Sequence, residues 1–198
     1  MTTADKFTVA TPADWINPSK QGKWTYEDYV SLPDDGNHYE IVNGVLYMAP
    51  SPTGEHQDAI LEIAAYLRTY VKLPQLGLVR VAPFDVRLSP TQVFQPDVLV
   101  VLNAHRDRIQ KRFILGAPDL AVEIASPSTA MIDRREKLDA YARSGVPEYW
   151  LVDANAHTVE VLMLENGIYH SLGLFEGEDT LPTKIVPNFP VQVRQFFA

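Results

Sequence analysis

Two carboxylates lie in the most apolar stretches of this sequence. Asp97 directly precedes the aliphatic run Val98–Leu102, and Glu123 lies inside a second apolar run, Leu120–Ala125. Ionised Asp and Glu side chains are almost never buried without a partner or a metal ion. If the two runs form neighbouring antiparallel strands, the start of one meets the end of the other, and both carboxylates converge at one end of the sheet. Two hard oxygen ligands with open positions are typical of Mg²⁺ sites that act on phosphates.

Strand alternation gives Glu123 only small neighbours on its own face. Ala121 and Ala125 flank it there, while the larger aliphatic side chains point to the opposite face. Small neighbours leave room for a metal ion with its waters. The alternative is structural: Glu123 pairs with a buried Lys or Arg, and Asp97 only caps a turn.

Lys137 is the candidate cation. Asp133, Lys137 and Tyr141 are spaced i, i+4 and i+8, so they share one face of the helix predicted there. Lys137 is about 100° around that helix from the apolar Leu138, so it flanks the buried stripe. It supplies a cation to the carboxylates, or it forms a surface ion pair with Asp133 that contributes a few tenths of a kcal/mol.

Glu40 and His56 are weaker candidates. Glu40 lies in a β-rich run, where an outward-facing glutamate is the simpler interpretation. His56 opens a long helix, which fits a cap or a hydrogen-bond donor to a metal-binding carboxylate better than a metal ligand. The five histidines form no HExxH-like pair, which argues against a zinc hydrolase, and no nucleotide-binding glycine loop is present.

Helices and strands are predicted to alternate irregularly around these residues. Asn43-Gly44 between two β-rich runs predicts a hairpin over residues 39–48. Helical spacing predicts a helix over residues 55–72, and residues 78–88 are expected to form one strand interrupted at Pro83. Further elements are expected at residues 126–129 (turn), 131–144 (helix), 148–152 and 158–164 (strands). The pattern indicates an α/β fold with a mixed β-sheet.

Length and composition are those of an ordinary globular domain. The chain has 198 residues, of which 46% are hydrophobic. We expect an N-terminal arm over residues 1–24, docked through Trp15 where it is ordered, and a single domain over residues 25–198. The absence of Cys excludes disulfides, thiolate zinc sites and Cys nucleophiles, and it is compatible with a cytoplasmic location.

The charge balance limits the classes of partner. With 17 basic and 25 acidic residues, the formal net charge of −8 argues against a broad electrostatic grip on nucleic acid or an anionic membrane. It leaves room for a local site where a bound cation inverts the charge. No run approaches the roughly 20 apolar residues of a membrane-spanning helix, so no membrane partner is expected.

The order of these residues resembles the Uma-two family of restriction-endonuclease-like proteins, within the PD-(D/E)XK nuclease superfamily. The matching residues are Tyr39–Gly44, His56, Gln95–Asp97, Val122–Ser128, Asp133, Lys137, Tyr141, Gly145–Val146 and Glu148–Trp150. The resemblance covers about residues 25–190. It implies a restriction-endonuclease-like core, in which a central mixed β-sheet is flanked by helices. It also implies hydrolysis of nucleic-acid phosphodiester bonds, with DNA as the expected substrate, and Mg²⁺ as the cofactor, with Mn²⁺ as an alternative.

Carried over position by position, the resemblance makes Asp97 and Glu123 the metal-binding acids and Glu40 an auxiliary acid. One position departs from the family pattern, because the superfamily's lysine two residues after the glutamate is Ala125 here. Lys137 is the expected substitute. A homodimer is expected, since cutting both strands of a duplex is easier with two sites and C₂ symmetry is common. The basic segment Arg106–Arg112 either contacts flanking phosphates or forms a solvated loop.

Three other functions remain open at this stage. A non-catalytic binding module on the same fold is favoured by the net charge and by Ala125. A carboxylate-pair hydrolase of sugars would need no metal. In a purely structural interpretation, Glu123 and Lys137 form a buried ion pair that apolar residues could replace without loss of stability.

Overall fold

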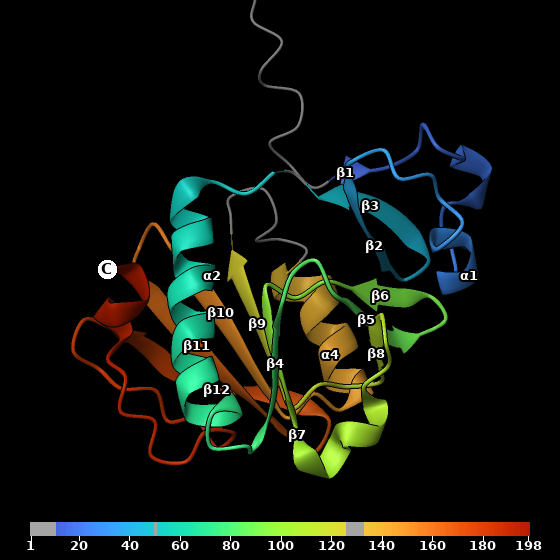
Figure 1. Cartoon of the computed structure of the whole chain (residues 1–198). Helices are drawn as coiled ribbons and strands as arrows, with labels where there is room; N and C mark the ends of the chain where they lie inside the picture. Colours follow the sequence, from blue (N-terminus) through green and yellow to red (C-terminus); the bar gives the residue numbers. More distant parts are fainter. Residues whose placement is uncertain (1–10, 50, 126–132) are drawn as a thin grey trace, which may run out of the picture.

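The strands form two mixed β-sheets that pack against each other (Figure 1). The computed structural model describes residues 11–49, 51–125 and 133–198, and within these residues each sheet has six strands. The first sheet, sheet A, has the order β1 (Thr11–Pro12), β3 (Val45–Ala49), β2 (His38–Val42), β6 (Gln92–Phe94), β5 (Asp85–Ser89) and β8 (Phe113–Leu115). The second, sheet B, has the order β12 (Ile168–Glu176), β11 (Thr158–Glu165), β10 (Glu148–Asp153), β9 (Leu120–Ala125), β7 (Val98–Leu102) and β4 (Gly77–Val81).

The helices of the described residues are few, and two of them matter for the site. The longest is α2 (Gly54–Leu67), which continues as the π-helical turn η3 (Arg68–Lys72). The other is α4 (Leu138–Ser144), which continues from the π-helical turn η5 (Asp133–Lys137). The remaining short helical segments are η2 (Pro18–Lys20), α1 (Tyr26–Tyr29), η4 (Asn103–Arg108) and η6 (Val193–Phe197). No helix in this described part is long and apolar enough to cross a membrane.

The hairpin β2–β3 forms where Asn-Gly predicts it. Asn43 has φ of +51° and Gly44 has φ of +75°, which a two-residue hairpin turn of this kind requires. A side chain at Gly44 would also meet the backbone of Gly22 at 2.7 Å, so the turn packs closely against the N-terminal arm. This hairpin carries Glu40 in β2.

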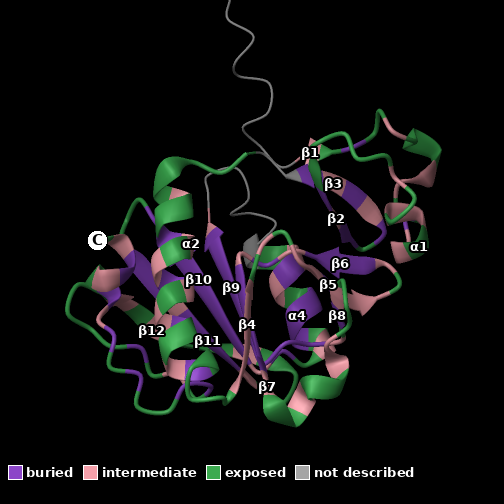
Figure 2. Ribbon diagram, in the orientation of Figure 1, coloured by how far each residue is buried: buried purple, intermediate pink, exposed green. Residues whose placement is uncertain are grey.

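Helix α2 covers one face of sheet B. Its apolar stripe, which includes Ile63 and Leu67, is fully buried against residues such as Val98 and Val122, whereas its outer face is exposed (Figure 2). The Thr53 side chain caps its first turn by accepting a hydrogen bond from the backbone N–H of His56. The helix predicted over residues 55–72 is therefore confirmed, and its start places His56 near the strand ends.

The opposite face of sheet B is covered by α4 and by sheet A. The Tyr141 side chain of α4 is fully buried among Phe94 of sheet A and Ala121 and Tyr149 of sheet B. Gly145, with φ of +80°, ends the helix with a left-handed cap. The turn expected over residues 126–129 and the expected start of this helix at Met131 lie outside the described residues.

The strand predicted over residues 78–88 is wrong. The segment forms two strands in different sheets: β4 pairs with β7 in sheet B, and β5 pairs with β6 and β8 in sheet A. Pro83 lacks the N–H that a continuing strand would need, and the chain changes sheets there. The expected α/β fold of mixed strands flanked by helices is confirmed, and its strands are divided between two mixed sheets.

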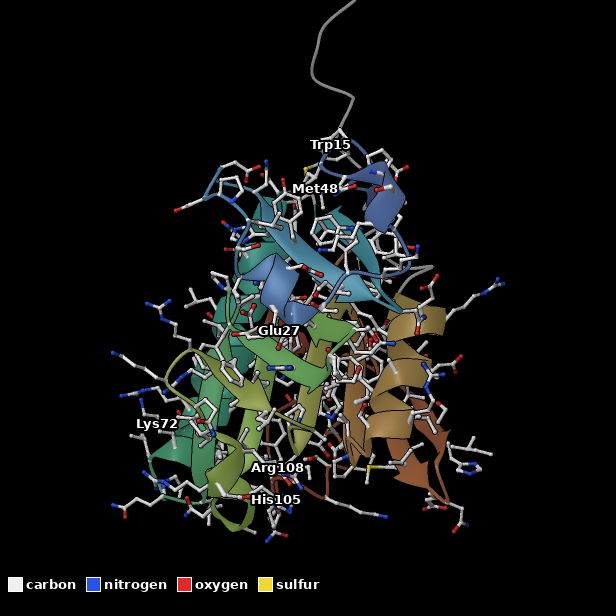
Figure 3. All side chains as sticks on the ribbon, turned by 90° about the vertical axis from the view of Figure 1, so that its right-hand side faces the viewer. Trp15, Glu27, Met48, Lys72, His105 and Arg108 are labelled. Atoms are coloured by element: carbon white, nitrogen blue, oxygen red, sulfur yellow. The ribbon has the colours of Figure 1, made fainter. Side chains whose placement is uncertain are left out.

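The N-terminal arm contacts the body of the protein through residues other than Trp15. Thr11 and Pro12 pair with β3, and the side chains of Ala13 and Trp24 are buried. Trp15 itself is 58% exposed and lies at one extremity of the molecule (Figure 3).

Candidate active site

Asp97 and Glu123 face each other across two neighbouring strands. Strands β7 and β9 are antiparallel with Val98 opposite Val122, so the next pair toward the strand ends is Asp97 and Glu123. Residues directly opposite each other project to the same face of a sheet. The Asp97 Oδ2 also accepts a 2.7 Å hydrogen bond from the backbone N–H of Ile124, which ties its carboxylate to β9. The strand arrangement on which the hypothesis depended is therefore present.

Lys137 points into the same cluster from the turn η5. Its Nζ lies 2.8 Å from Glu40 Oε2 and 3.2 Å from Glu123 Oε1. The relative exposures of Lys137 and Glu123 are only 5% and 4%. Ala125 occupies the position of the superfamily lysine, but the cluster still contains a cation. Lys137 reaches Glu123 from the following helical segment.

Glu40 belongs to the interior of this cluster. Its side chain is 14% exposed, and its Oε1 accepts a 2.7 Å hydrogen bond from the backbone N–H of Gln95. The interpretation of an outward-facing strand glutamate is therefore excluded. Glu40 joins sheet A to sheet B through Lys137.

His56 binds the carboxylate of Asp97. Its Nε2 lies 3.0 Å from Asp97 Oδ1, and both side chains are mostly buried. Together with the N–H of Ile124, this contact gives each oxygen of Asp97 a partner. His56 thus has the geometry of a residue that orients a carboxylate.

Tyr141 is a site residue whose role the sequence did not reveal. Its hydroxyl donates a 2.9 Å hydrogen bond to Glu123 Oε1, the oxygen that also contacts Lys137. Burial, reinforced by the negative charge of Glu123, raises the pKa of Tyr141 well above its ordinary value of 10.0. The hydroxyl therefore stays protonated and acts as a donor. The available signal was its spacing of i+4 from Lys137.

Asp85, which Gln95 links to Glu40, is a further acidic residue that the sequence patterns did not single out. Its Oδ1 accepts hydrogen bonds from Gln95 Nε2 at 2.9 Å and from the Tyr29 hydroxyl at 3.1 Å. Burial raises the pKa of Asp85 above its ordinary value of 3.8; the two hydrogen bonds lower it, and the charge of Glu40 raises it. Gln95 thus links two acids, through its side chain to Asp85 and through its backbone to Glu40.

The donor set fits a divalent cation. Asp97, Glu123 and Glu40 carry three negative charges when ionised, and Lys137 balances one, so the cluster has a charge of −2 when His56 is neutral. Among the described residues no group of three or more His, Cys, Asp or Glu side chains forms a metal cage. Mg²⁺ does not require one, since it commonly takes one or two carboxylates and completes its shell with waters and substrate phosphates.

Comparisons with known proteins identify the family and the fold of this chain. Residues 26–194 match the model of the Uma2 family, which is described as "Putative restriction endonuclease". The fold is similar to that of a protein described as "a putative nuclease belonging to DUF820 from Anabaena variabilis ATCC 29413". That match has a TM-score of 0.71 and 22% sequence identity, and it covers 87% of this chain and 97% of the other. A comparison with curated proteins gave no match. Because the family model spans most of the sequence, this chain belongs to the Uma2 family and is a restriction-endonuclease-like, nuclease-type protein.

Proposed function

We propose that this protein is a metal-dependent endonuclease that hydrolyses phosphodiester bonds of DNA. The observation that supports this best is the convergence of Asp97 and Glu123 on adjacent strands, with Lys137 held between Glu123 and Glu40. One buried ammonium among three carboxylates leaves an excess of negative charge. A divalent ion at this place would offset that excess.

Asp97 and Glu123 are the residues that would hold the ion, Mg²⁺ or alternatively Mn²⁺. When bound, such an ion lowers the pKa of a coordinated water and polarises the scissile phosphate. Both acids are already oriented, Asp97 by His56 and the N–H of Ile124, and Glu123 by Tyr141. Carboxylates held in this way need little rearrangement when a ligand arrives.

Lys137 has two roles in this proposal. Its ammonium donates hydrogen bonds, so it orients the attacking water and stabilises negative charge that develops on the phosphate oxygens. Glu40 fixes the ammonium at 2.8 Å, and the backbone N–H of Gln95 in turn fixes Glu40. Glu40 is thus a positioning residue for Lys137.

The test is a cleavage assay with supercoiled plasmid and with labelled DNA duplexes, in Mg²⁺, in Mn²⁺ and in EDTA. We expect cleavage only with a divalent ion. The variants D97N and E123Q should each lose about 10³-fold in rate, because a metal ligand contributes several kcal/mol to transition-state stabilisation and each 1.4 kcal/mol is about tenfold. The exposed Glu165, at the end of β11, supplies the control variant E165Q, which should cleave normally.

Two results would contradict the proposal. Cleavage in EDTA would favour a metal-independent carboxylate-pair hydrolase. DNA binding by the wild-type protein without cleavage under any of these conditions would identify a non-catalytic binding module. RNA substrates in parallel assays would show whether DNA is preferred.

The proposal includes a cytoplasmic homodimer. Two active sites related by a twofold axis can cut both strands of a duplex, and C₂ dimers are the commonest oligomers. Light scattering coupled to size-exclusion chromatography should give twice the chain mass of 22.2 kDa. A monomer in the presence and absence of DNA would overturn this part of the proposal.

A further inference from the structure

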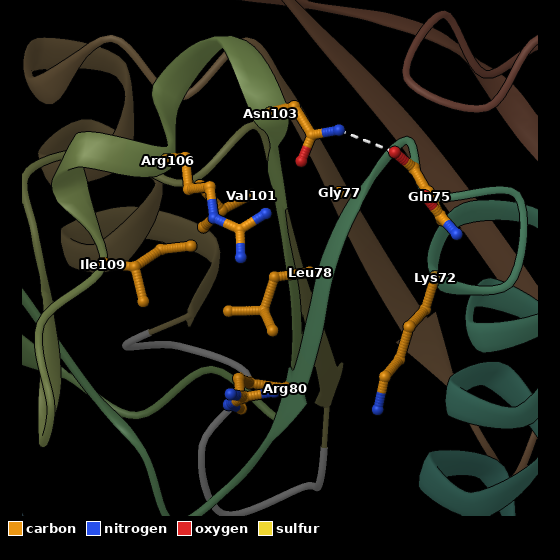
Figure 4. A pocket seen from close by; sticks show the side chains of 9 residues that line it. All are labelled: Lys72, Gln75, Gly77, Leu78, Arg80, Val101, Asn103, Arg106 and Ile109. Atoms are coloured by element: carbon orange, nitrogen blue, oxygen red, sulfur yellow. Dashed lines mark hydrogen bonds between the residues drawn. The ribbon is translucent and has the colours of Figure 1, made fainter.

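A basic pocket opens on the outer strand β4 of sheet B, separate from the acidic cluster (Figure 4). It has a volume of about 500 Å³. The cationic side chains of Lys72, Arg80 and Arg106 line it, with Leu78 and Val101 as an apolar floor. No carboxylate residue is among those that line it in the described part of the chain.

The three cations of this pocket are available to a ligand. Within residues 11–49, 51–125 and 133–198, none of them forms an ion pair with a carboxylate. The Arg80 guanidinium lies 5.8 Å from the ring centroid of Phe84 and donates to the carbonyl of Val79, which restrains it. Three lining cations without an ion-pair partner among the described residues stand out on a chain whose formal charge is −8.

Two nearby basic side chains are committed to the fold and so do not belong to the pocket. His105 Nδ1 lies 2.7 Å from Asp119 Oδ1, and Arg108 donates a 2.6 Å hydrogen bond to the carbonyl of Ala117. Figure 3 shows both residues, with Lys72, toward the end of the molecule opposite Trp15. The contrast is with Lys72 and Arg106, whose side chains line the pocket and form no ion pair within the described residues.

Hydrogen bonds between two lining segments fix the rim of the pocket. Asn103 Nδ2 donates a 2.6 Å hydrogen bond to the carbonyl of Gln75, which connects the segment carrying Arg106 to the turn that follows Lys72 (Figure 4). The backbone N–H of Asn103 also donates to the carbonyl of Leu76. A ligand would therefore meet a formed site.

The part of the pocket formed by Arg80 lies on the same face of sheet B as the acidic cluster. In the β4–β7 register, Arg80 is opposite Leu99, and Leu99 shares its face with Asp97 two residues earlier. With about 3.3 Å per residue and about 4.8 Å between strands, the Cα atoms of Arg80 and Asp97 are about 8 Å apart. Arg80 is thus the end of the pocket nearest to the proposed site of hydrolysis.

We propose that this pocket binds backbone phosphates of the nucleic-acid strand that enters the acidic cluster, a proposal that rests on the proposed function. Arg and Lys side chains bind phosphate oxygens through charge-assisted hydrogen bonds. Contacts of this kind position a nucleic acid without reading its sequence. They also give an acidic chain a local means of holding a polyanion close to its own carboxylates.

The test is the salt dependence of DNA binding, measured by fluorescence anisotropy with a labelled 20-base-pair duplex in EDTA. The double variant K72Q/R106Q changes two exposed side chains and should fold normally. Each lost phosphate contact lowers the slope of log K against log salt by about 0.9, so we expect a decrease of about 2 and binding weaker on the order of tenfold. The control R143Q/K184Q removes two exposed charges elsewhere and should leave both quantities unchanged.

The outcomes are distinct. Unchanged affinity and slope in K72Q/R106Q would overturn the proposal. So would unchanged duplex binding in K72Q/R106Q with loss of inorganic pyrophosphate binding, which would identify a site for free phosphate compounds. Pocket-dependent binding in a wild-type protein that never cleaves DNA would support the pocket and refute the nuclease proposal, so the two proposals fail separately.

Discussion

Two buried glutamates on neighbouring strands of sheet B differ in the charge of the groups around them. Glu123 in β9 is in contact with a buried ammonium, lies opposite Asp97 and shares its ammonium with Glu40. Glu148 in β10 is fully buried, and the partners found for it are neutral N–H groups. They are the Trp150 indole at 2.7 Å and the backbone N–H groups of Lys184 at 2.9 Å and Ile185 at 3.4 Å.

Under the proposed function, the difference separates a structural carboxylate from a metal-binding one. Neutral donors satisfy Glu148 and attach the C-terminal segment to the sheet, an arrangement that needs no further ligand. Glu123 is instead grouped with other negative charges, which mutually destabilise one another unless a cation joins them. Burial alone thus does not mark a candidate catalytic acid, whereas burial among like charges does.

The largest expected difference between the two glutamates is in stability. The E148Q variant turns one carboxylate oxygen into an amide NH₂ that faces an N–H donor, so a buried donor loses its partner. We expect the free energy of unfolding to fall by about 3 kcal/mol. In E123Q the amide oxygen can still accept from Tyr141, and Lys137 keeps Glu40, so the loss should be below about 1 kcal/mol.

Urea denaturation in EDTA measures both variants under the same conditions. If E123Q lost as much stability as E148Q, Glu123 would be a structural member of a buried ion pair. The proposed difference in role between the two glutamates would then be wrong. The cleavage rate per folded molecule gives the complementary readout, since E148Q should retain it and E123Q should not.

The next largest effect is expected for His56, which supports the cluster from outside. The H56A variant leaves Asp97 with one partner fewer, and removal of a residue that orients a metal-binding group commonly costs 10- to 100-fold in affinity or activity. Mn²⁺ affinity and the cleavage rate should fall together. The exposed His170 provides the control variant H170A, and equal activities of the two variants would show that the His56 contact has no functional role.

Local patterns in the sequence singled out the two acids and kept the lysine among the candidates. Asp97 and Glu123 stand out because carboxylates are rare in apolar strands, and helical phase kept Lys137 near the buried stripe. The hairpin at Asn43-Gly44 followed from the backbone conformation that this dipeptide favours.

Contacts between distant segments were not predictable in the same way. Glu40 and Lys137 are 97 positions apart, and only the packing of sheet A against sheet B brings them together. The same holds for Tyr29, Asp85 and Gln95, since a hydrogen bond between separate elements has no periodic signature. The division of residues 78–88 between two sheets was missed because strand pairing depends on partners far along the chain.

A smaller effect is expected from the ion itself. With a dissociation constant of about 1 mM, 10 mM Mg²⁺ should raise the free energy of unfolding of the wild-type protein by about 1.4 kcal/mol. E148Q, though less stable, should gain the same amount, whereas E123Q should gain nothing. Denaturation with and without Mg²⁺ tests this, and an equal gain in E123Q would place the bound ion somewhere other than at Glu123.

The smallest expected effect concerns Asp85, which resembles Glu148 in being held by neutral donors but also faces the charge of Glu40. Because burial raises its folded-state pKa above the ordinary 3.8, the folded protein binds more protons than the unfolded chain between those two values. The stability contributed by Asp85 therefore falls as pH rises through that window, and above it the ionised group is a constant cost.

In D85N the amide oxygen can accept from both Tyr29 and Gln95 without a charge, so the variant should be more stable than wild type at pH 7. The advantage should shrink toward pH 4, whereas the exposed Asp107 provides a control, D107N, with no such trend. Urea denaturation between pH 4 and pH 8 measures the difference, and a pH-independent gap would show that the amide, and not the lost charge, causes it.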